Sequence, residues 1–272
     1  MINNNTKIFI SIGSSPGNVG TFIYNRLFKK NNINAIYKSF KVENLKDAIT
    51  SIKTLKVNGF SVAMPFKSKI ISELDNVENI AKSINSVNTV LLKNGKLRGY
   101  NTDIEGINAA IKKHKMNKDS KILIIGLGGA ASSTLYVLNR LNNFKNIFIT
   151  NRSKRGLSYL KKIGSFVFIH NFHKNKIIFD VIINCTPIGM KKHKNDLPAH
   201  ESLISKSKIV IDFINNPKET KLIKCAKKYR KKYVSGDFIS MHQIYNQINI
   251  YLDKKIAYHQ INNAYKAYEK NE

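Results

Sequence analysis

The stretch KILIIGLGGAASSTLYVLNRL, residues 121–141, decides the fold of the second half of this chain. It opens with an apolar run that predicts a buried strand, and the residues after the glycines predict a helix over 129–142. A second apolar run, NIFIT at 146–150, predicts the next strand. Strand, loop, helix and strand in this order form a β-α-β unit, which is typical of an open α/β sheet.

The loop of this unit matches the pattern G-x-G-x-x-G/A with Gly126, Gly128 and Ala131. Gly126 permits a tight turn, Gly128 lets the backbone approach a pyrophosphate, and the small Ala131 allows the helix to pack closely on the strand. Gly129 and Ala130 begin the helix, whose free N–H groups attract an anion. The loop therefore predicts dinucleotide binding.

The end of the following strand indicates which dinucleotide is bound. An NAD-binding unit usually has an acidic residue here for the ribose hydroxyl. This chain instead has a polar and basic run, which consists of Asn151, Arg152, Ser153, Lys154 and Arg155. Arg152 can pair with a 2′-phosphate, and Asn151 and Ser153 can donate hydrogen bonds to it. NADP is thus the expected cofactor, and a solvated basic turn is the alternative.

Length and composition favour a globular protein of two domains. The chain has 272 residues, of which 42% are hydrophobic, and no apolar run is long enough to span a bilayer. The N-terminus lacks the charged and apolar regions of a secretory signal, so we expect a cytoplasmic protein with no membrane partner. Cys185 and Cys225 are too few and too isolated for a disulfide framework or a metal site, and no metal is expected.

The net charge of +29 raises the possibility of nucleic-acid binding. The positive residues are mostly Lys, however, and are spread from Lys7 to Lys270 rather than gathered in one motif. The basic run at 227–232 follows a helical pattern, on which it would form a solvated face. We therefore expect no nucleic-acid partner. A positive surface would also attract a small anionic substrate. We expect the protein to be a monomer or a homodimer.

The first hundred residues alternate between strand and helix patterns. Strands are predicted at 7–12, 35–40 and 59–64, and helices at 20–30, 44–56 and 76–84. Two further strands, in VNTVLL and KLRGYN, are separated by Asn94 and Gly95, a strong hairpin signal.

The rest of the chain continues the alternation. Helices are predicted from Asp103 to Lys115 and at 153–162, and strands near 166–169, at 180–184 and at 208–213; beyond Gly236 the pattern is purely helical. The predicted fold class is α/β, with an N-terminal α/β substrate-binding domain at 1–103, a Rossmann-type NADP-binding domain at 104–236, and C-terminal helices at 237–272 that return to the first domain.

Three segments of the first domain place polar residues at predicted strand ends, where open α/β sheets bind ligands. They are SVAMPFK (61–67), SVNTV (86–90) and GYNTD (99–103). Taken singly, Lys67 would more often be a surface lysine, Asn88 a turn residue and Asp103 a helix cap.

Together, these segments resemble the signatures of the shikimate dehydrogenase family. The resemblance extends to GLGGAASS (126–133), TNRS (150–153), INCTPIGM (183–190) and SGDFISMHQ (235–243), in the same order and over nearly the whole chain. It implies NADPH-dependent, reversible reduction of 3-dehydroshikimate to shikimate, and with it a place in the chorismate pathway of aromatic amino acid biosynthesis.

The resemblance also implies roles for individual residues. Lys67 matches the catalytic lysine and Asp103 its partner aspartate; which of the two accepts the proton stays open. Asn88 and Gln243 match residues that bind substrate hydroxyls. Thr186 and Gly236 lie in the segments that match cofactor-contacting parts of the family.

Several substrate-facing positions depart from the family pattern. The S-x-S whose hydroxyls hold the substrate carboxylate aligns with Asn18, Val19 and Gly20. Ser61 and Ala63 replace an asparagine and a threonine, and Asn215 replaces a tyrosine. The chain thus resembles the shikimate-dehydrogenase-like subgroup, with Asn18, Gly20 and Ser61 still expected at the substrate. Ser14 and Ser15 either replace the lost hydroxyls or merely form a turn.

These departures leave two functions open. The protein acts on shikimate or a closely related cyclic polyol acid, with weak turnover of shikimate itself, because losing a hydrogen bond to a carboxylate costs about 1.5–3 kcal/mol. Alternatively, it is a non-catalytic NADP-binding or regulatory module on the same fold.

Overall fold

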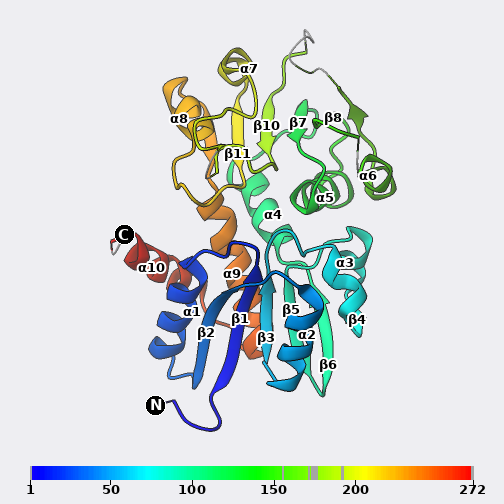
Figure 1. Ribbon diagram of the computed structural model, residues 1–272. Coiled ribbons are helices and arrows are strands. Elements are labelled where there is room, and N and C mark those ends of the chain that lie inside the picture. Colours follow the sequence, from blue (N-terminus) through cyan, green and yellow to red (C-terminus); the bar gives the residue numbers. More distant parts are fainter. Residues whose placement is uncertain (1, 155, 171, 173–176, 191–192, 271–272) are drawn as a thin grey trace. The chain divides into compact units, whose positions relative to one another are not determined.

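The computed structural model describes residues 2–154, 156–170, 172, 177–190 and 193–270. The chain divides into two compact units (Figure 1). The first unit consists of residues 1–102 and 241–272, and the second of residues 103–240. Each has its own six-stranded sheet, so the expected α/β fold class is confirmed.

The first sheet has the strand order β2-β1-β3-β5-β6-β4. Its strands are β1 (Lys7–Gly13), β2 (Ala35–Lys41), β3 (Gly59–Val62), β4 (Asn76–Val77), β5 (Thr89–Lys93) and β6 (Lys96–Tyr100). The βαβ connections make β1 parallel to β2 and β3, while β5 runs antiparallel to β3 and β6. The turn between β5 and β6 forms as predicted, with positive φ at both Asn94 and Gly95.

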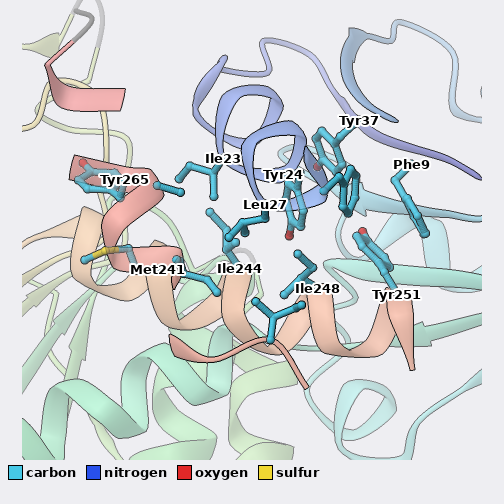
Figure 2. Packing of buried hydrophobic residues seen from close by; sticks show 14 residues of the cluster. Phe9, Ile23, Tyr24, Leu27, Tyr37, Met241, Ile244, Ile248, Tyr251 and Tyr265 are labelled. Carbon is cyan, nitrogen blue, oxygen red and sulfur yellow. The ribbon is translucent and has the colours of Figure 1, made fainter. Parts of the chain in front are cut away.

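Helices cover both faces of the first sheet. They are α1 (Val19–Lys30), α2 (Leu45–Thr54), the 3₁₀ helix η1 (Lys69–Glu73), α3 (Asn79–Ser83), α9 (Gly236–Leu252) and α10 (Tyr258–Glu269). Because successive residues of a strand face opposite ways, Phe9 joins the core with α1, α9 and α10, whereas Ile10 and Ile12 join the core with α2. Figure 2 shows Ile244 and Ile248 of α9 in the first of these cores.

The second sheet is entirely parallel, in the order β12-β11-β10-β7-β8-β9. Its strands are β7 (Ile122–Ile125), β8 (Ile147–Thr150), β9 (Val167–Phe168), β10 (Val181–Asn184), β11 (Ile209–Asp212) and β12 (Lys232–Val234). Chain order reverses between β7 and β10. This is the strand order of the doubly wound nucleotide-binding fold, in which ligands bind at the carboxyl ends of the strands beside the reversal.

The helices of the second unit connect these strands. They are α4 (Asp103–Lys113), α5 (Gly129–Tyr136), the π-helical turn η2 (Val137–Leu141), α6 (Leu157–Ile163), α7 (Glu201–Lys206), α8 (Lys221–Lys228) and the first residues of α9. A core of β7, β10 and β11 side chains packs against α7 and α8.

Three predicted elements need correction. The helix expected at 76–84 is a short strand at Asn76–Val77 followed by α3, because β4 pairs with β6. The helix expected from residue 153 begins at Leu157, since Gly156 adopts a left-handed conformation that precedes the helix. The basic run at 227–232 is not one helical face, because α8 ends at Lys228 and Lys232 begins β12.

Candidate active site

The glycine-rich loop joins β7 to α5 at the carboxyl end of the second sheet. Gly126 has a φ of +119°, and a Cβ built there would lie 3.0 Å from the carbonyl oxygen of Cys185, so glycine is required by the fold. Gly128 has an ordinary φ, and a Cβ at this position would meet nothing within 4 Å. The protein's own packing therefore does not explain Gly128, whereas the predicted close approach of a pyrophosphate would.

The start of α5 completes this loop. Gly129 is its first residue, the carbonyl of Ala130 accepts the Thr134 hydroxyl at 2.8 Å, and Ala131 is fully buried. The first backbone N–H groups of a helix have no partner within it and favour an anion. The loop thus has the geometry expected of a pyrophosphate cradle.

The basic loop after β8 lies against the glycine-rich loop. A Cβ at Gly156 would lie 3.3 Å from the carbonyl oxygen of Leu127, which places the two loops in contact. Arg152, Ser153 and Lys154 are exposed, and Asn151 Nδ2 donates to the Ser153 carbonyl at 3.0 Å. Arg155 lies outside the described residues. Arg152 therefore lies on a loop that adjoins the predicted nucleotide site.

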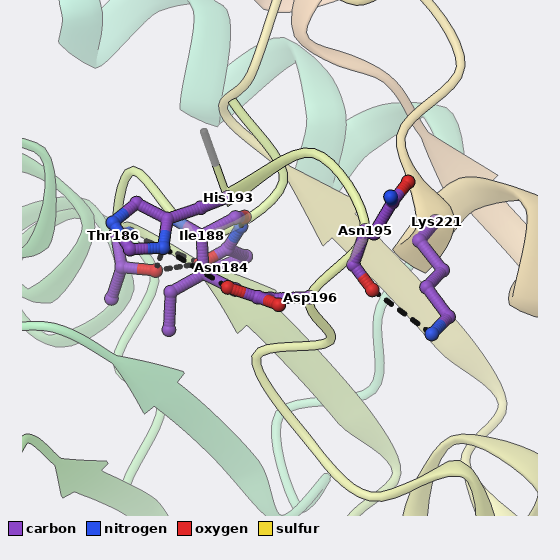
Figure 3. Close-up of polar contacts among 7 residues, drawn as sticks. All are labelled: Asn184, Thr186, Ile188, His193, Asn195, Asp196 and Lys221. Carbon is purple, nitrogen blue, oxygen red and sulfur yellow. Dashed lines mark hydrogen bonds and ion pairs between the residues drawn. The ribbon is translucent and has the colours of Figure 1, made fainter. Parts of the chain in front are cut away.

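Thr186 is held in a network at the end of β10 (Figure 3). Its backbone N–H and its hydroxyl both donate to Asn184 Oδ1, at 3.1 and 2.7 Å. The Thr186 hydroxyl in turn accepts the N–H of Ile188 at 3.2 Å. Because β10 neighbours β7, this network fixes the chain beside the glycine-rich loop.

The same network contains a buried carboxylate that the sequence analysis did not single out. Asp212 accepts hydrogen bonds from Asn184 Nδ2 at 3.0 Å, from the Thr220 hydroxyl at 2.6 Å and from the N–H of Ile214 at 3.2 Å. Burial raises the pKa of Asp212 to about 6, against these hydrogen bonds, which lower it. A signal was present in the sequence, because one acidic residue ends the otherwise apolar run KIVID.

Gly236, expected to contact the cofactor, is where α9 begins. A Cβ there would lie 2.2 Å from the carbonyl oxygen of Ile214, so any side chain would clash with the backbone. The contact with Ile214 by itself accounts for glycine at this position. Its role in binding a cofactor stays a prediction.

In the first unit, Lys67 and Asn88 come from neighbouring segments. The N–H of Val87 donates to the Lys67 carbonyl at 2.8 Å, and the N–H of Val62 donates to the Asn88 carbonyl at 2.8 Å. Lys67 is half-buried and Asn88 is fully buried. Lys67 follows the carboxyl end of β3, and Asn88 precedes the antiparallel strand β5 at the same edge of the sheet.

Ser61, the third residue of β3, belongs to a buried polar cluster. Its Oγ lies 2.6 Å from the Tyr37 hydroxyl, 2.8 Å from Gln247 Oε1 and 3.2 Å from the Tyr251 hydroxyl. Tyr24 also donates to Gln247 Oε1, at 2.5 Å. The sequence did not predict the three tyrosines and Gln247 as site residues, because nothing local in it marks residues so far apart as partners.

The other predicted substrate residues lie on α1 and α9. Asn18 is exposed and precedes α1. Gly20 lies in the first turn of α1, where a Cβ would be 3.3 Å from Cε1 of Tyr37. Gln243 is half-buried on α9, one turn before Gln247. Each belongs to the first unit.

Asp103, the predicted partner of Lys67, is the buried first residue of α4 and belongs to the second unit. Its helix starts where the sequence predicted. The pairing of Asp103 with Lys67 stays a prediction, as do the assigned roles of the other site residues.

Within the described part of the chain, no three His, Cys, Asp or Glu side chains are grouped so that they could hold a metal ion. No helix in it has the length and apolar character needed to cross a bilayer.

A cavity of about 460 Å³ in the second unit is lined by residues that precede strands, among them Ser120, Asp180 and Lys208. It therefore lies at the opposite end of the strands from Gly126, and it is not the predicted nucleotide site.

The sheet order and the glycine-rich loop define the class: an α/β protein with a Rossmann-type nucleotide-binding unit. Residues 17–90 match the shikimate dehydrogenase substrate binding domain. A shikimate dehydrogenase-like protein of Haemophilus influenzae is 32% identical to the chain over 257 residues, which is 94% of each protein. The shikimate dehydrogenase (NADP(+)) of Methanosphaera stadtmanae is 36% identical over 249 residues, which is 87% of each.

The solved structures agree with these sequence relatives. The crystal structure of shikimate dehydrogenase from Aquifex aeolicus is similar to this one with a TM-score of 0.87 and 32% identity, over 97% of this chain and 99% of that one. The chain belongs to the shikimate dehydrogenase family. The resemblance inferred from the motifs is thereby confirmed.

Proposed function

We propose that the protein is an NADP-dependent oxidoreductase of shikimate dehydrogenase type, which reversibly reduces 3-dehydroshikimate to shikimate or acts on a closely related cyclic polyol acid. The observation that carries this proposal is Gly128, a glycine that the protein's own packing does not require, in a loop at the reversal point of a parallel sheet. The name of the Methanosphaera relative, shikimate dehydrogenase (NADP(+)), supports the same cofactor.

Residues of the second unit would hold the dinucleotide. The backbone of Gly126, Gly128 and Gly129 and the first N–H groups of α5 suit the pyrophosphate, and the Arg152 guanidinium suits a 2′-phosphate. Bound NADP supplies or accepts a hydride. Further residues are proposed to line the dinucleotide site: Ala130, Asn151, Ser153 and Thr186. The adenine half of the cofactor would then lie along the loop after β8.

Lys67 is the proposed acid of the reduction. Its ammonium donates a hydrogen bond to the carbonyl oxygen of the substrate and transfers a proton as negative charge develops there. In the oxidation direction, either Lys67 or Asp103 accepts the proton.

Substrate binding is proposed for Asn18, Asn88 and Gln243 of the first unit, with Gly20 and Ser61 at the position of the altered carboxylate pocket. The ring of Tyr37 lies beside Gly20, which favours a carboxylate pocket that differs from that of the family. For the same reason, a non-catalytic NADP-binding module stays the alternative function. We further propose that the protein works in the cytoplasm as a monomer or homodimer.

The test uses the purified full chain with NADP⁺ and, in turn, shikimate, quinate and aminoshikimate, and follows formation of NADPH. We expect turnover of at least one of these acids. Lys67→Ala should lower kcat by roughly 10²- to 10⁴-fold, the usual contribution of a general acid, whereas Lys69→Ala, an exposed lysine two residues on, should retain activity. Binding of NADP without turnover of any substrate would instead support the non-catalytic module.

A further inference from the structure

The hydrogen-bond donors of the buried polar cluster can be assigned from Gln247. Its Nε2 lies 3.2 Å from the backbone carbonyl of Asn88, an atom that can only accept, so this end of the amide is the nitrogen. Its Oε1 then faces the hydroxyls of Tyr24 and Ser61, which must both donate to it. The orientation of the Gln247 amide is therefore fixed by chemistry.

Two tyrosine hydroxyls contact Ser61 Oγ, those of Tyr37 and Tyr251. Since the Ser61 proton is given to Gln247, the hydroxyls of Tyr37 and Tyr251 must donate to Ser61 Oγ. Burial raises the pKa of Tyr37 to about 12 and those of Tyr24 and Tyr251 well above the usual value, so all three stay protonated near neutral pH. Ser61 has thus given its one proton to the protein and has none left for a substrate.

The other end of the cluster reaches the side chain of Asn88. Gln247 Nε2 donates to Thr89 Oγ1 at 2.7 Å, and Thr89 Oγ1 donates to Asn88 Oδ1 at 2.9 Å. The backbone N–H of Thr102, which can only donate, lies 2.8 Å from the same atom. That atom is therefore the amide oxygen, and the NH₂ group of Asn88 is the other branch of its side chain.

We propose that Gln247 is a positioning residue that, through Thr89, sets the amide of Asn88 so that Asn88 offers its N–H groups to an acceptor oxygen of the substrate. The inference rests on the proposed function, because it takes Asn88 as a substrate residue. It also makes Ser61 part of the support of this residue rather than a direct contact. The substrate must then present a hydroxyl, carbonyl or carboxylate oxygen at Asn88 as an acceptor.

Gln247→Glu tests this directly, because a carboxylate cannot donate. Ionised, the introduced carboxylate would draw the Thr89 proton away from Asn88 Oδ1, whereas the protonated acid keeps one donor. The titratable groups that face it are Tyr24 of α1, Tyr37 of β2 and Tyr251 of α9, all protonated over the range used. Near pH 9 the KM of this variant for shikimate should be about tenfold above that of the wild type, which is the effect of losing one hydrogen bond. Near pH 6 the two KM values should become similar.

The matched control is Gln260→Glu. Gln260 accepts a hydrogen bond from Asn31 at 2.8 Å and is part-buried in the same unit, away from Asn88. The KM of the Gln260→Glu variant for shikimate should equal that of the wild type at every pH. The KM for NADP⁺ should stay within about twofold of wild type in both variants. Each variant alters one hydrogen bond of the first unit, whereas the dinucleotide is proposed to bind to the second unit. A pH-independent KM in Gln247→Glu would overturn the inference.

A second variant and a second measurement keep the test decisive. Thr89→Val removes one donor to Asn88 Oδ1 at nearly constant volume and leaves the Thr102 N–H and hydroxyl, which also donate to it at 2.8 and 3.1 Å. It should raise the KM for shikimate at every pH, and it serves as the test variant if Gln247→Glu does not fold. The side-chain amide signals of Asn88 in ¹⁵N NMR spectra should shift in either variant and not in Gln260→Glu. If the wild type turns over no candidate substrate, the proposed function fails, and unchanged Asn88 signals would overturn the positioning role separately.

Discussion

The ring of Tyr37 packs against Gly20, so that a Cβ at position 20 would lie 3.3 Å from Tyr37 Cε1 and 3.6 Å from its hydroxyl. This contact leaves little room for a side chain at position 20, where the sequence comparison predicts that one serine of the family's S-x-S pattern is replaced. Tyr37 is stacked on Tyr24 with ring centroids 4.2 Å apart and is bonded to Ser61, so it has little freedom to move aside.

Gly20→Ser should therefore not restore a better carboxylate pocket. The added side chain must displace Tyr37, and overpacking of this kind costs about 1–3 kcal/mol of unfolding free energy. We expect a lower melting temperature and no fall in the KM for shikimate. Gly17→Ser is the control, because a Cβ at Gly17 would meet nothing within 4 Å. A marked fall in the KM for shikimate with Gly20→Ser would show that the Tyr37 ring can move aside.

Gly126 and Gly128 should respond differently to alanine. Gly126→Ala places a side chain at a φ of +119° beside the Cys185 carbonyl and should destabilise the folded protein. Gly128→Ala should leave thermal stability unchanged or slightly raised and yet weaken NADP binding, because the added methyl group lies where the pyrophosphate must approach. Calorimetric titration with NADP⁺ and thermal unfolding measure the two effects. Full NADP affinity in Gly128→Ala would remove the main support for the cradle.

Arg152→Ala should weaken NADP more than NAD. Loss of a charge-assisted hydrogen bond to a 2′-phosphate costs about 1.5–3 kcal/mol, or roughly ten- to a hundredfold in Kd, and NAD carries no such phosphate. Lys154→Ala, an exposed residue of the same loop, should have a smaller effect. An equal loss for the two dinucleotides would show that Arg152 does not read the phosphate.

Asp212 should make stability depend on pH. Its pKa is about 6 in the folded protein and close to 3.8 unfolded, so between these values the folded state binds more protons. Stability from this group is therefore present in acid and is lost as the pH rises through about 6, by about 3 kcal/mol in total. The unfolding free energy of wild type minus that of Asp212→Asn, measured from pH 4 to 7, should fall over this range. A constant difference would contradict the prediction.

The sequence predicted the parts of the site that local chemistry controls. The glycine-rich loop was identifiable because Gly126 and Gly128 stand between a strand and a helix, and the turn at Asn94 and Gly95 because positive φ selects these residues. Sequence periodicity assigned the basic run at 227–232 to a helix, although sheet pairing makes Lys232 the start of β12.

The polar cluster could not be found in the same way. Tyr24 and Gln247 are 223 positions apart, and each reads alone as an ordinary residue of an amphipathic helix. Only folding brings their side chains together on β3. Asp212 is the intermediate case, since an acidic residue at the end of an apolar strand is unusual enough to note, but its partner Thr220 lies beyond a turn.

The first unit is built from both ends of the chain, residues 1–102 and 241–272. Ile244, Ile248 and Tyr251 of α9 complete the core that Phe9 and Tyr24 begin. During synthesis on the ribosome, the second unit therefore has all its residues before the first unit does. The apolar faces of the early strands therefore stay exposed until α9 and α10 have been synthesised. A chain truncated before α9 would leave this core without the side chains that cover it.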